Sequence, residues 1–170
     1  MPLPVAAVVL LAALLHAGWN ALVGASRDKA LDVVLVAACG AAVAALALPF
    51  LPPPARASWP NLLASVAIHT VYFALLVKAY RHGDFSPAYT LMRGTAPLLV
   101  ALGGIAAGEV LGASQAAGVA LVSTGVAATG LLGGRRTAAR GRAAAWALGN
   151  AAVIASYTLV DGAGVRRSGS

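Results

Sequence analysis

The sequence predicts an all-α protein, a polytopic membrane bundle of about six transmembrane helices. Hydrophobic residues make up 60% of the 170-residue chain and charged residues only 10%, and the mean hydropathy is +0.84. Soluble domains are about 45–50% apolar and about 25% charged, so a soluble chain of this length could not bury so much apolar surface. We therefore expect the lipid bilayer as its surroundings, in the inner (plasma) membrane of the cell.

Six apolar stretches are about as long as the 20 residues that a helix needs to cross a bilayer: 4–24, 31–51, 60–80, 85–107, 113–132 and 143–162. The first has no basic residue before Arg27, so we interpret it as a spanning helix rather than a signal peptide. The connections are short and hold most of the turn-forming and charged residues. Short connections make consecutive helices antiparallel neighbours, which predicts an up-and-down bundle.

The formal net charge of +7 comes from basic residues that lie between the apolar stretches or at their ends, apart from Lys78 and Arg93. This pattern is typical of membrane flanks, so we expect no nucleic-acid partner. Basic residues are more numerous on one side of the predicted bundle, which places the N-terminus outside the cytoplasm. The richer side has Arg27, Lys29, Lys78, Arg81, Arg135, Arg136, Arg140 and Arg142, and the poorer side has Arg56, Arg166 and Arg167.

The sequence predicts no enzyme, no metal site and no cofactor. Cys39 is the single cysteine, so the chain can form neither an internal disulfide nor a cysteine-based zinc site, and we expect Cys39 to be a small buried hydrophobe. The histidines and acidic residues are scattered over different helices and loops. None of their spacings is typical of a catalytic pair or triad.

A weak internal repeat predicts the domain organisation. The segment "AGWNALVGA" (17–25) aligns with "ASYTLVDGA" (155–163), so the sixth helix restarts the first after a unit of five. A unit with an odd number of spans must be inverted when it repeats, and inverted repeats are typical of secondary transporters. We therefore expect a five-helix membrane repeat over 1–133, a basic loop over 134–142, and the first helix of a second, incomplete inverted repeat over 143–170.

The stretch "AYTLMRGTAPLLVALGG" (88–104) carries an arginine and a proline inside an apolar helix. A central arginine costs about 2.5–3.5 kcal/mol on insertion scales. Pro97 has no N–H, so the carbonyl of Arg93 loses its helical partner, and Gly94 loosens the helix further. The charge and the expected helix break are at the same place in the helix, which predicts that this part of the helix is a cavity wall. Tyr89 is one turn earlier and would be part of the same wall. The alternative is that Arg93 extends to the nearer membrane surface. The pair Gly104 and Gly108 forms a GxxxG, expected to pack against another helix.

Other polar residues at bilayer depth share helix faces and are candidates for the same cavity. His16, Trp19 and Asn20 adjoin in the first helix, and His69 and Tyr72 are three residues apart in the third. Asn150 and Tyr157 lie on one face of the sixth helix, with Trp146 and Asp161 on the same face. The alternative is packing and interhelical hydrogen bonding. The predicted substrate cavity comprises Arg93, Tyr89, Pro97, Gly94, His16, Trp19, Asn20, Tyr72, His69, Asn150 and Tyr157.

Three segments resemble the EamA-domain transporters of the drug/metabolite transporter superfamily: "LLHAGWNALVGASRDK", "VKAYRHGDFSPAYTLMRGTAPLLVALGGIAAGE" and "ASYTLVDGAGVRRSG". The resemblance covers essentially the whole chain and implies ten helices in two inverted five-helix repeats around a central cavity. It also implies that Tyr89, Arg93 and Pro97 lie on the cavity helix of the first repeat, with the polar residues of the first helix facing them. Four helices of the second repeat are absent, and the family's N-terminus is expected to be cytoplasmic, in contrast to the charge distribution here.

The predicted function is therefore an integral membrane transporter that moves a small metabolite or drug by alternating access, in a truncated form. The alternative is a non-transporting fragment, or a subunit that needs a partner chain to complete the cavity. That partner would be a second copy of the chain or a complementary protein.

Overall fold

The computed structural model describes residues 3–82, 85–132 and 138–169, and the part that it describes contains helices and no strand. The helices are α1 (Leu3–Ala25), α2 (Lys29–Ala47), α3 (Trp59–His82), α4 (Phe85–Ala106), α5 (Ala113–Leu132) and α6 (Ala138–Ser168). Two short 3₁₀ helices, η1 (Leu48–Phe50) and η2 (Arg56–Ser58), flank a proline-rich link. The chain divides within this link into two compact units, Met1–Pro52 and Pro53–Ser170. The all-α class is confirmed for the described residues.

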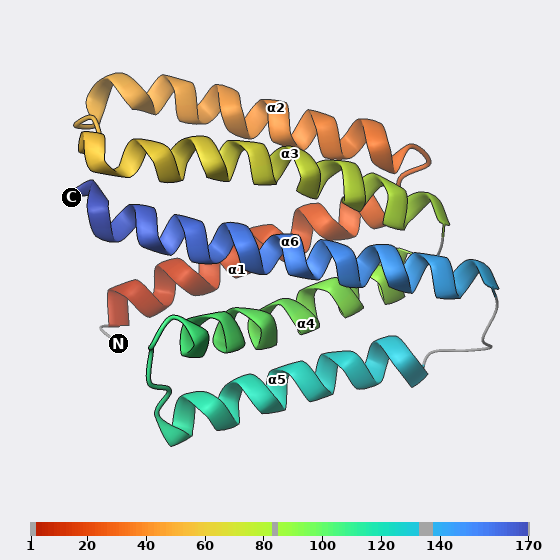
Figure 1. Ribbon diagram of the computed structural model, residues 1–170. Helices are drawn as coiled ribbons and strands as arrows, with labels where there is room; N and C mark the ends of the chain where they lie inside the picture. Colours follow the sequence, from red (N-terminus) through yellow and green to blue (C-terminus); the bar gives the residue numbers. More distant parts are fainter. Residues whose placement is uncertain (1–2, 83–84, 133–137, 170) are drawn as a thin grey trace. The chain divides into compact units, whose positions relative to one another are not determined.

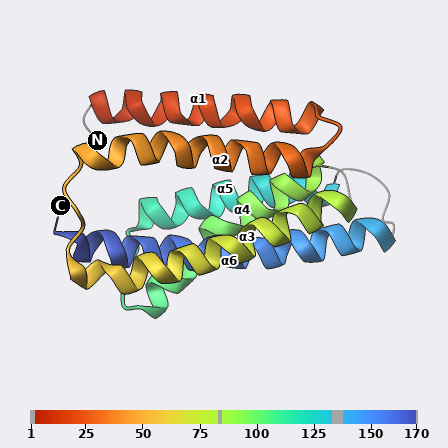
Figure 2. The same cartoon turned by 90° about the horizontal axis from the view of Figure 1, so that it is seen from above.

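The first unit contains α1 and α2, which run alongside each other in the view of Figure 2 but diverge in that of Figure 1, so they meet only near the turn that joins them. Asp28 begins α2 because its Oδ1 accepts a hydrogen bond from the amide of Leu31 at 3.0 Å. Almost all of the leucines and valines of the two helices are exposed. Cys39 is also exposed, so the expectation that it is buried was wrong. The described buried residues of the two helices, Asn20, Val23 and Val33, lie near the connecting turn, and Cys39 lies further along α2.

The second unit contains four helices in the order α3, α6, α4 and α5 (Figure 1). α6 lies between α3 and α4, so these two consecutive helices are not each other's main neighbours as the up-and-down prediction required. α4 and α5 do pack together as predicted. Contacts at both ends show that α3 and α6 are antiparallel. Asn61 Nδ2 donates to the carbonyl of Val160 at 3.1 Å, and Lys78 Nζ lies 4.8 Å from the ring centroid of Trp146.

Small residues bring the helices of the second unit together. Ala79, Ala147 and Ala151 are fully buried. A Cβ added at Gly103 would lie 2.5 Å from Leu159 Cδ1, so α4 and α6 approach closely there. The predicted packing role of the pair Gly104 and Gly108 was wrong.

Gly108 lies beyond the end of α4 with a φ of 89°, and a Cβ built on it would meet no atom within 4 Å among the described residues. The amide of Glu109 donates to the carbonyl of Gly104 at 2.9 Å, and that of Gly108 to Ile105 at 2.9 Å. This is the Schellman pattern that ends helices at a glycine. The two glycines therefore terminate α4 instead of packing it against another helix.

Four helical stretches of the described chain are long and apolar enough to cross a membrane: Leu3–Ala25, Leu31–Phe50, Arg56–Ala79 and Gly141–Ser168. Ala113–Val126 is apolar but shorter. In α4, Arg93 and Pro97 lower the mean hydropathy of the helix. α6 begins at Ala138, so the last residues of the predicted 134–142 loop are helical, while 134–137 lie outside the described residues. The apolar helices suit a membrane protein, and the count of six spans stays a prediction.

Candidate functional site

An aromatic group joins α3 to α6 near the middle of both helices. The rings of His69 and Tyr157 are stacked, with centroids 4.1 Å apart and an interplanar angle of 29°. Tyr72 meets Tyr157 edge to face at 5.9 Å and 84°. His69 Nδ1 lies 2.9 Å from the carbonyl oxygen of Ser65, which fixes the orientation of the imidazole. His69 and Tyr72 of α3 and Tyr157 of α6, all predicted as cavity residues, therefore form one group, which we call the aromatic group.

Arg93 brings a positive charge from α4 to the aromatic group. Its guanidinium carbon lies 5.9 Å from the ring centroid of Tyr89, one turn earlier on the same helix. Tyr72 is close enough to the same guanidinium for an electrostatic interaction. Arg93 Nε is buried and has no hydrogen-bond partner among the described residues. The site thus holds a cation whose donor capacity is only partly used.

Asn150 places an amide at the contact of α6 with α4. Asn150 and Met92 are the largest side chains that are fully buried, each with 0% exposure. Asn150 Nδ2 lies 3.5 Å from Met92 Sδ, a weak hydrogen bond. Asn150 Oδ1 is buried without a partner within the described part of the chain. Buried polar atoms are nearly always hydrogen-bonded, so this acceptor and the Arg93 donor are unusual.

Pro97 and Gly94 do not interrupt α4, contrary to the prediction. α4 continues as an α-helix through Pro97, so the expected helix break was wrong. One missing N–H removes a single backbone hydrogen bond, and packing on α5 and α6 maintains the helix. A Cβ added at Gly94 would overlap the side chain of Val126. Gly94 therefore allows close packing of α4 on α5.

The three candidates of α1 form a group of their own in the first unit. Trp19 Nε1 donates to His16 Nδ1 at 3.2 Å, and the two rings meet at 89°. Asn20 Nδ2 donates to the carbonyl oxygen of His16 at 2.7 Å. Asn20 Oδ1 is buried and has no hydrogen-bond partner among the described residues. These contacts match the predicted shared face, and the predicted approach of this group to Arg93 stays a prediction.

Two further polar residues with structural contacts or burial were not predicted from the sequence. Ser123 of α5 is buried, with its Oγ unpartnered within the described ranges. Asn61 of α3 makes two hydrogen bonds to α6: its Oδ1 accepts from Arg167 Nη1 at 3.1 Å, and its Nδ2 donates to the carbonyl of Val160. An asparagine in the first turn of an apolar helix is a signal for such a contact, but its partner is distant in sequence. Glu109 is exposed and pairs with Arg166 at 3.9 Å, as suits a residue beyond a helix end.

A pocket of about 230 Å³ lies at the end of the second unit where α3 begins and α6 ends. None of the predicted cavity residues lines it, although Asp161 does. Among the described residues, no three His, Cys, Asp or Glu side chains are grouped as metal ligands. No family model, curated protein or solved structure matches the chain.

Proposed function

We propose that the chain is a multi-pass transporter of the inner (plasma) membrane, built like the EamA-domain proteins that three of its segments resemble. The observation that supports this most is that Arg93 lies within the apolar helix α4 and has a buried nitrogen without a hydrogen-bond partner among the described residues. An ionisable group at bilayer depth is costly and usually marks a substrate or ion pathway.

The chemistry of the neighbouring groups suggests the class of solute. A guanidinium offers a planar fork of donors that suits a carboxylate. Asn150 Oδ1 is a buried acceptor that suits an N–H or O–H of the same solute. The aromatic group supplies apolar faces beside these polar atoms. We therefore propose a small metabolite or drug with a carboxylate, a hydrogen-bond donor and an apolar portion.

Transport would proceed by alternating access, with all six helices crossing the membrane. Pro97 leaves the carbonyl oxygen of Arg93 without its helical donor, so backbone as well as side-chain polarity is available at this depth. Such polarity is tolerated where it faces protein or a water-filled cavity. The solute would bind there by supplying the hydrogen bonds that these polar groups lack.

The first test is a ligand screen on the purified chain. We would measure thermal unfolding in detergent against a panel of small carboxylates and their amides, and then uptake of each stabilising compound into proteoliposomes. We expect carboxylates to stabilise the protein and their amides to do so less. Arg93→Gln should weaken binding by about 10–100-fold, because a hydrogen-bonded charge contributes about 1.5–3 kcal/mol.

Arg142→Gln is the matched control, because Arg142 is exposed near the start of α6 and lies outside the site. Both variants must insert into membranes at the level of the unmodified chain. Unchanged uptake by Arg93→Gln would refute the role of Arg93. Binding without uptake by the unmodified chain would favour the alternative, a subunit that needs a partner to complete the cavity.

A further inference from the structure

The pocket between α3 and α6 lies apart from the Arg93 site and has mostly apolar walls. Its lining comes from the start of α3 with the link before it and from the last two turns of α6: Pro54, Ser58, Asn61, Leu62, Asp161, Gly164, Val165 and Ser168. Its volume of about 230 Å³ corresponds to about eight molecules of liquid water. That volume also suits the upper part of one acyl chain. Leu62 and Val165 are exposed, so the pocket is accessible.

The pocket lies where two candidate spans end. The stretches Arg56–Ala79 and Gly141–Ser168 are antiparallel, so the start of one meets the end of the other. The amide of Ala55 donates to the carbonyl of Ser168 at 3.1 Å and closes this end. A 24-residue helix is about 36 Å long, slightly more than the ~30 Å hydrocarbon core, so its ends reach the lipid headgroups.

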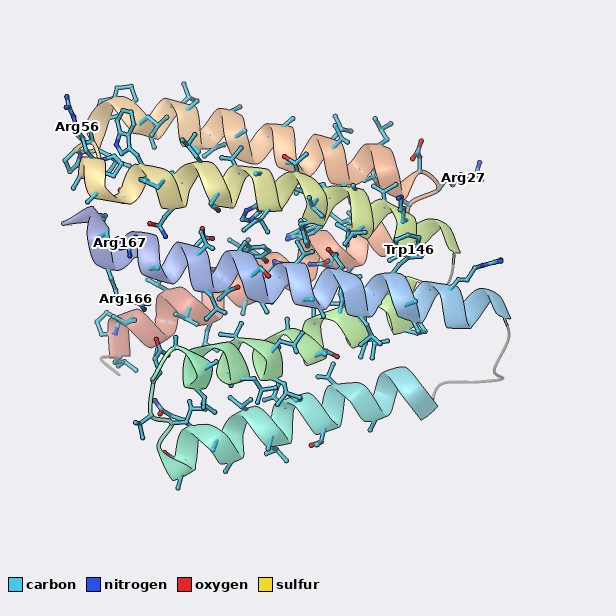
Figure 3. All side chains as sticks on the ribbon, viewed as in Figure 1. Arg27, Arg56, Trp146, Arg166 and Arg167 are labelled. Carbon is cyan, nitrogen blue, oxygen red and sulfur yellow. The ribbon has the colours of Figure 1, made fainter. Side chains whose placement is uncertain are left out.

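Charges of both signs lie at the same end of the second unit as the pocket. Arg56, Arg166 and Arg167 are at this end of the second unit, and Trp146 is at the opposite end (Figure 3). Arg167 donates to Asn61 Oδ1, whereas the side chain of Arg56 has no hydrogen-bond or ion-pair partner among the described residues. The carboxylate of Asp161, in the pocket wall, also has none within the described ranges.

We propose that this pocket binds a phospholipid with a primary amino headgroup, of the phosphatidylethanolamine class. One acyl chain would begin in the apolar pocket. The phosphate would accept hydrogen bonds from Arg167 and Arg56, and the ammonium would donate to Asp161. Basic residues between or beside transmembrane helices bind the phosphates of other lipid classes, such as cardiolipin and phosphoinositides. A carboxylate beside arginines matches a zwitterion better than an acidic lipid, and the apolar walls favour a lipid over a soluble phosphate compound.

The test is native mass spectrometry of the whole chain in detergent, titrated with phosphatidylethanolamine, phosphatidylcholine and phosphatidylglycerol of identical acyl chains. The three lipids share the phosphate and differ in the amine. Phosphatidylcholine has no N–H to donate, and phosphatidylglycerol has no cation. We expect phosphatidylethanolamine to bind about five-fold more tightly than either, as one charged contact near the membrane surface contributes about 1 kcal/mol.

Three variants separate the parts of the proposal. Asp161→Asn should remove the preference for phosphatidylethanolamine and leave binding of phosphatidylcholine unchanged. Arg56→Gln should weaken the binding of all three lipids by a similar factor, and it breaks no hydrogen bond or ion pair of the described residues. Arg167→Gln should act similarly, although it also loses the bond to Asn61. Arg142→Gln, near the start of α6, is the control and should change nothing.

Equal binding of the three lipids by the unmodified chain would overturn the proposal. So would tighter binding of phosphatidylglycerol, since that lipid has no ammonium for Asp161. An unchanged lipid preference in Asp161→Asn, in a protein that unfolds at the normal temperature, would also overturn it. None of these outcomes bears on Arg93, because the two sites share no residue.

Discussion

At the scale of single residues, the proposed site contains a donor on α4 and an acceptor on α6 that the described residues do not satisfy. Arg93 Nε and Asn150 Oδ1 are both buried and unpartnered among the described residues. An unpaired buried polar group costs about 1–3 kcal/mol, which folding alone does not recover. A bound solute that pairs with both atoms would recover it. The two residues therefore support the transport proposal more than the aromatic group does, since stacked rings are common in packed cores.

Asn150→Leu separates stability from binding. Leucine has a similar size and removes the unpaired oxygen, at the loss of one weak bond to Met92 Sδ. We expect the free energy of unfolding to be unchanged or to rise by about 1 kcal/mol. We expect the affinity for the stabilising carboxylate to fall about tenfold. Thermal unfolding in detergent with and without that ligand measures both quantities.

Ser123→Ala is the comparison for this variant. Its hydroxyl is also buried and unpartnered in the described part of the chain, but it lies on α5 and outside the proposed site. We expect no change in ligand affinity. A marked loss of stability in Asn150→Leu, with ligand affinity unchanged, would show that the amide is structural.

At the scale of the helices, Gly94 controls the contact between α4 and α5. A Cβ on Gly94 would overlap Val126, so Gly94→Ala should separate the helices and cost about 1–3 kcal/mol of stability. Gly118→Ala is the matched control on α5, because a Cβ there meets nothing within 4 Å among the described residues. It should stabilise the helix by up to about 1 kcal/mol.

The double variant Gly94→Ala with Val126→Gly should recover part of the loss, since it removes the overlapping side chain. Unfolding temperatures of the single and double variants in detergent measure the effect. Equal unfolding temperatures for Gly94→Ala and the original chain would show that α4 and α5 do not approach as closely as described.

The sequence predicted the helices better than their pairing. Length and apolarity located all six helices, because a run of apolar residues is a property of one segment. Periodicity also placed His69 with Tyr72, and Asn150 with Tyr157, on shared faces. It could not predict that α6 lies between α3 and α4, because that depends on contacts between distant residues, such as Asn61 with Val160. The roles of Gly94 and Gly108 were missed because each depends on local geometry that a GxxxG or Arg-Gly pattern does not determine.

At the scale of the whole molecule, the proposed transport site requires α4 and α5 to cross the membrane. Among the described residues, four stretches meet the criteria for spanning, and the described parts of α4 and α5 are not among them. If only those four cross, the hairpin of α4 and α5 stays on the side of Arg27. If all six cross, the turn that follows α4 lies on the opposite side. Only the second arrangement places Arg93 within the bilayer.

The position of Val110 tests this most directly. It lies in that turn and is 94% exposed. We would replace Cys39 with serine, introduce Val110→Cys or Arg27→Cys singly, and label intact cells and inverted vesicles with a membrane-impermeant thiol reagent. We predict that cysteines at 110 and 27 are labelled from opposite sides of the membrane. Labelling of both from the same side would place Arg93 outside the membrane and contradict the proposed transport site.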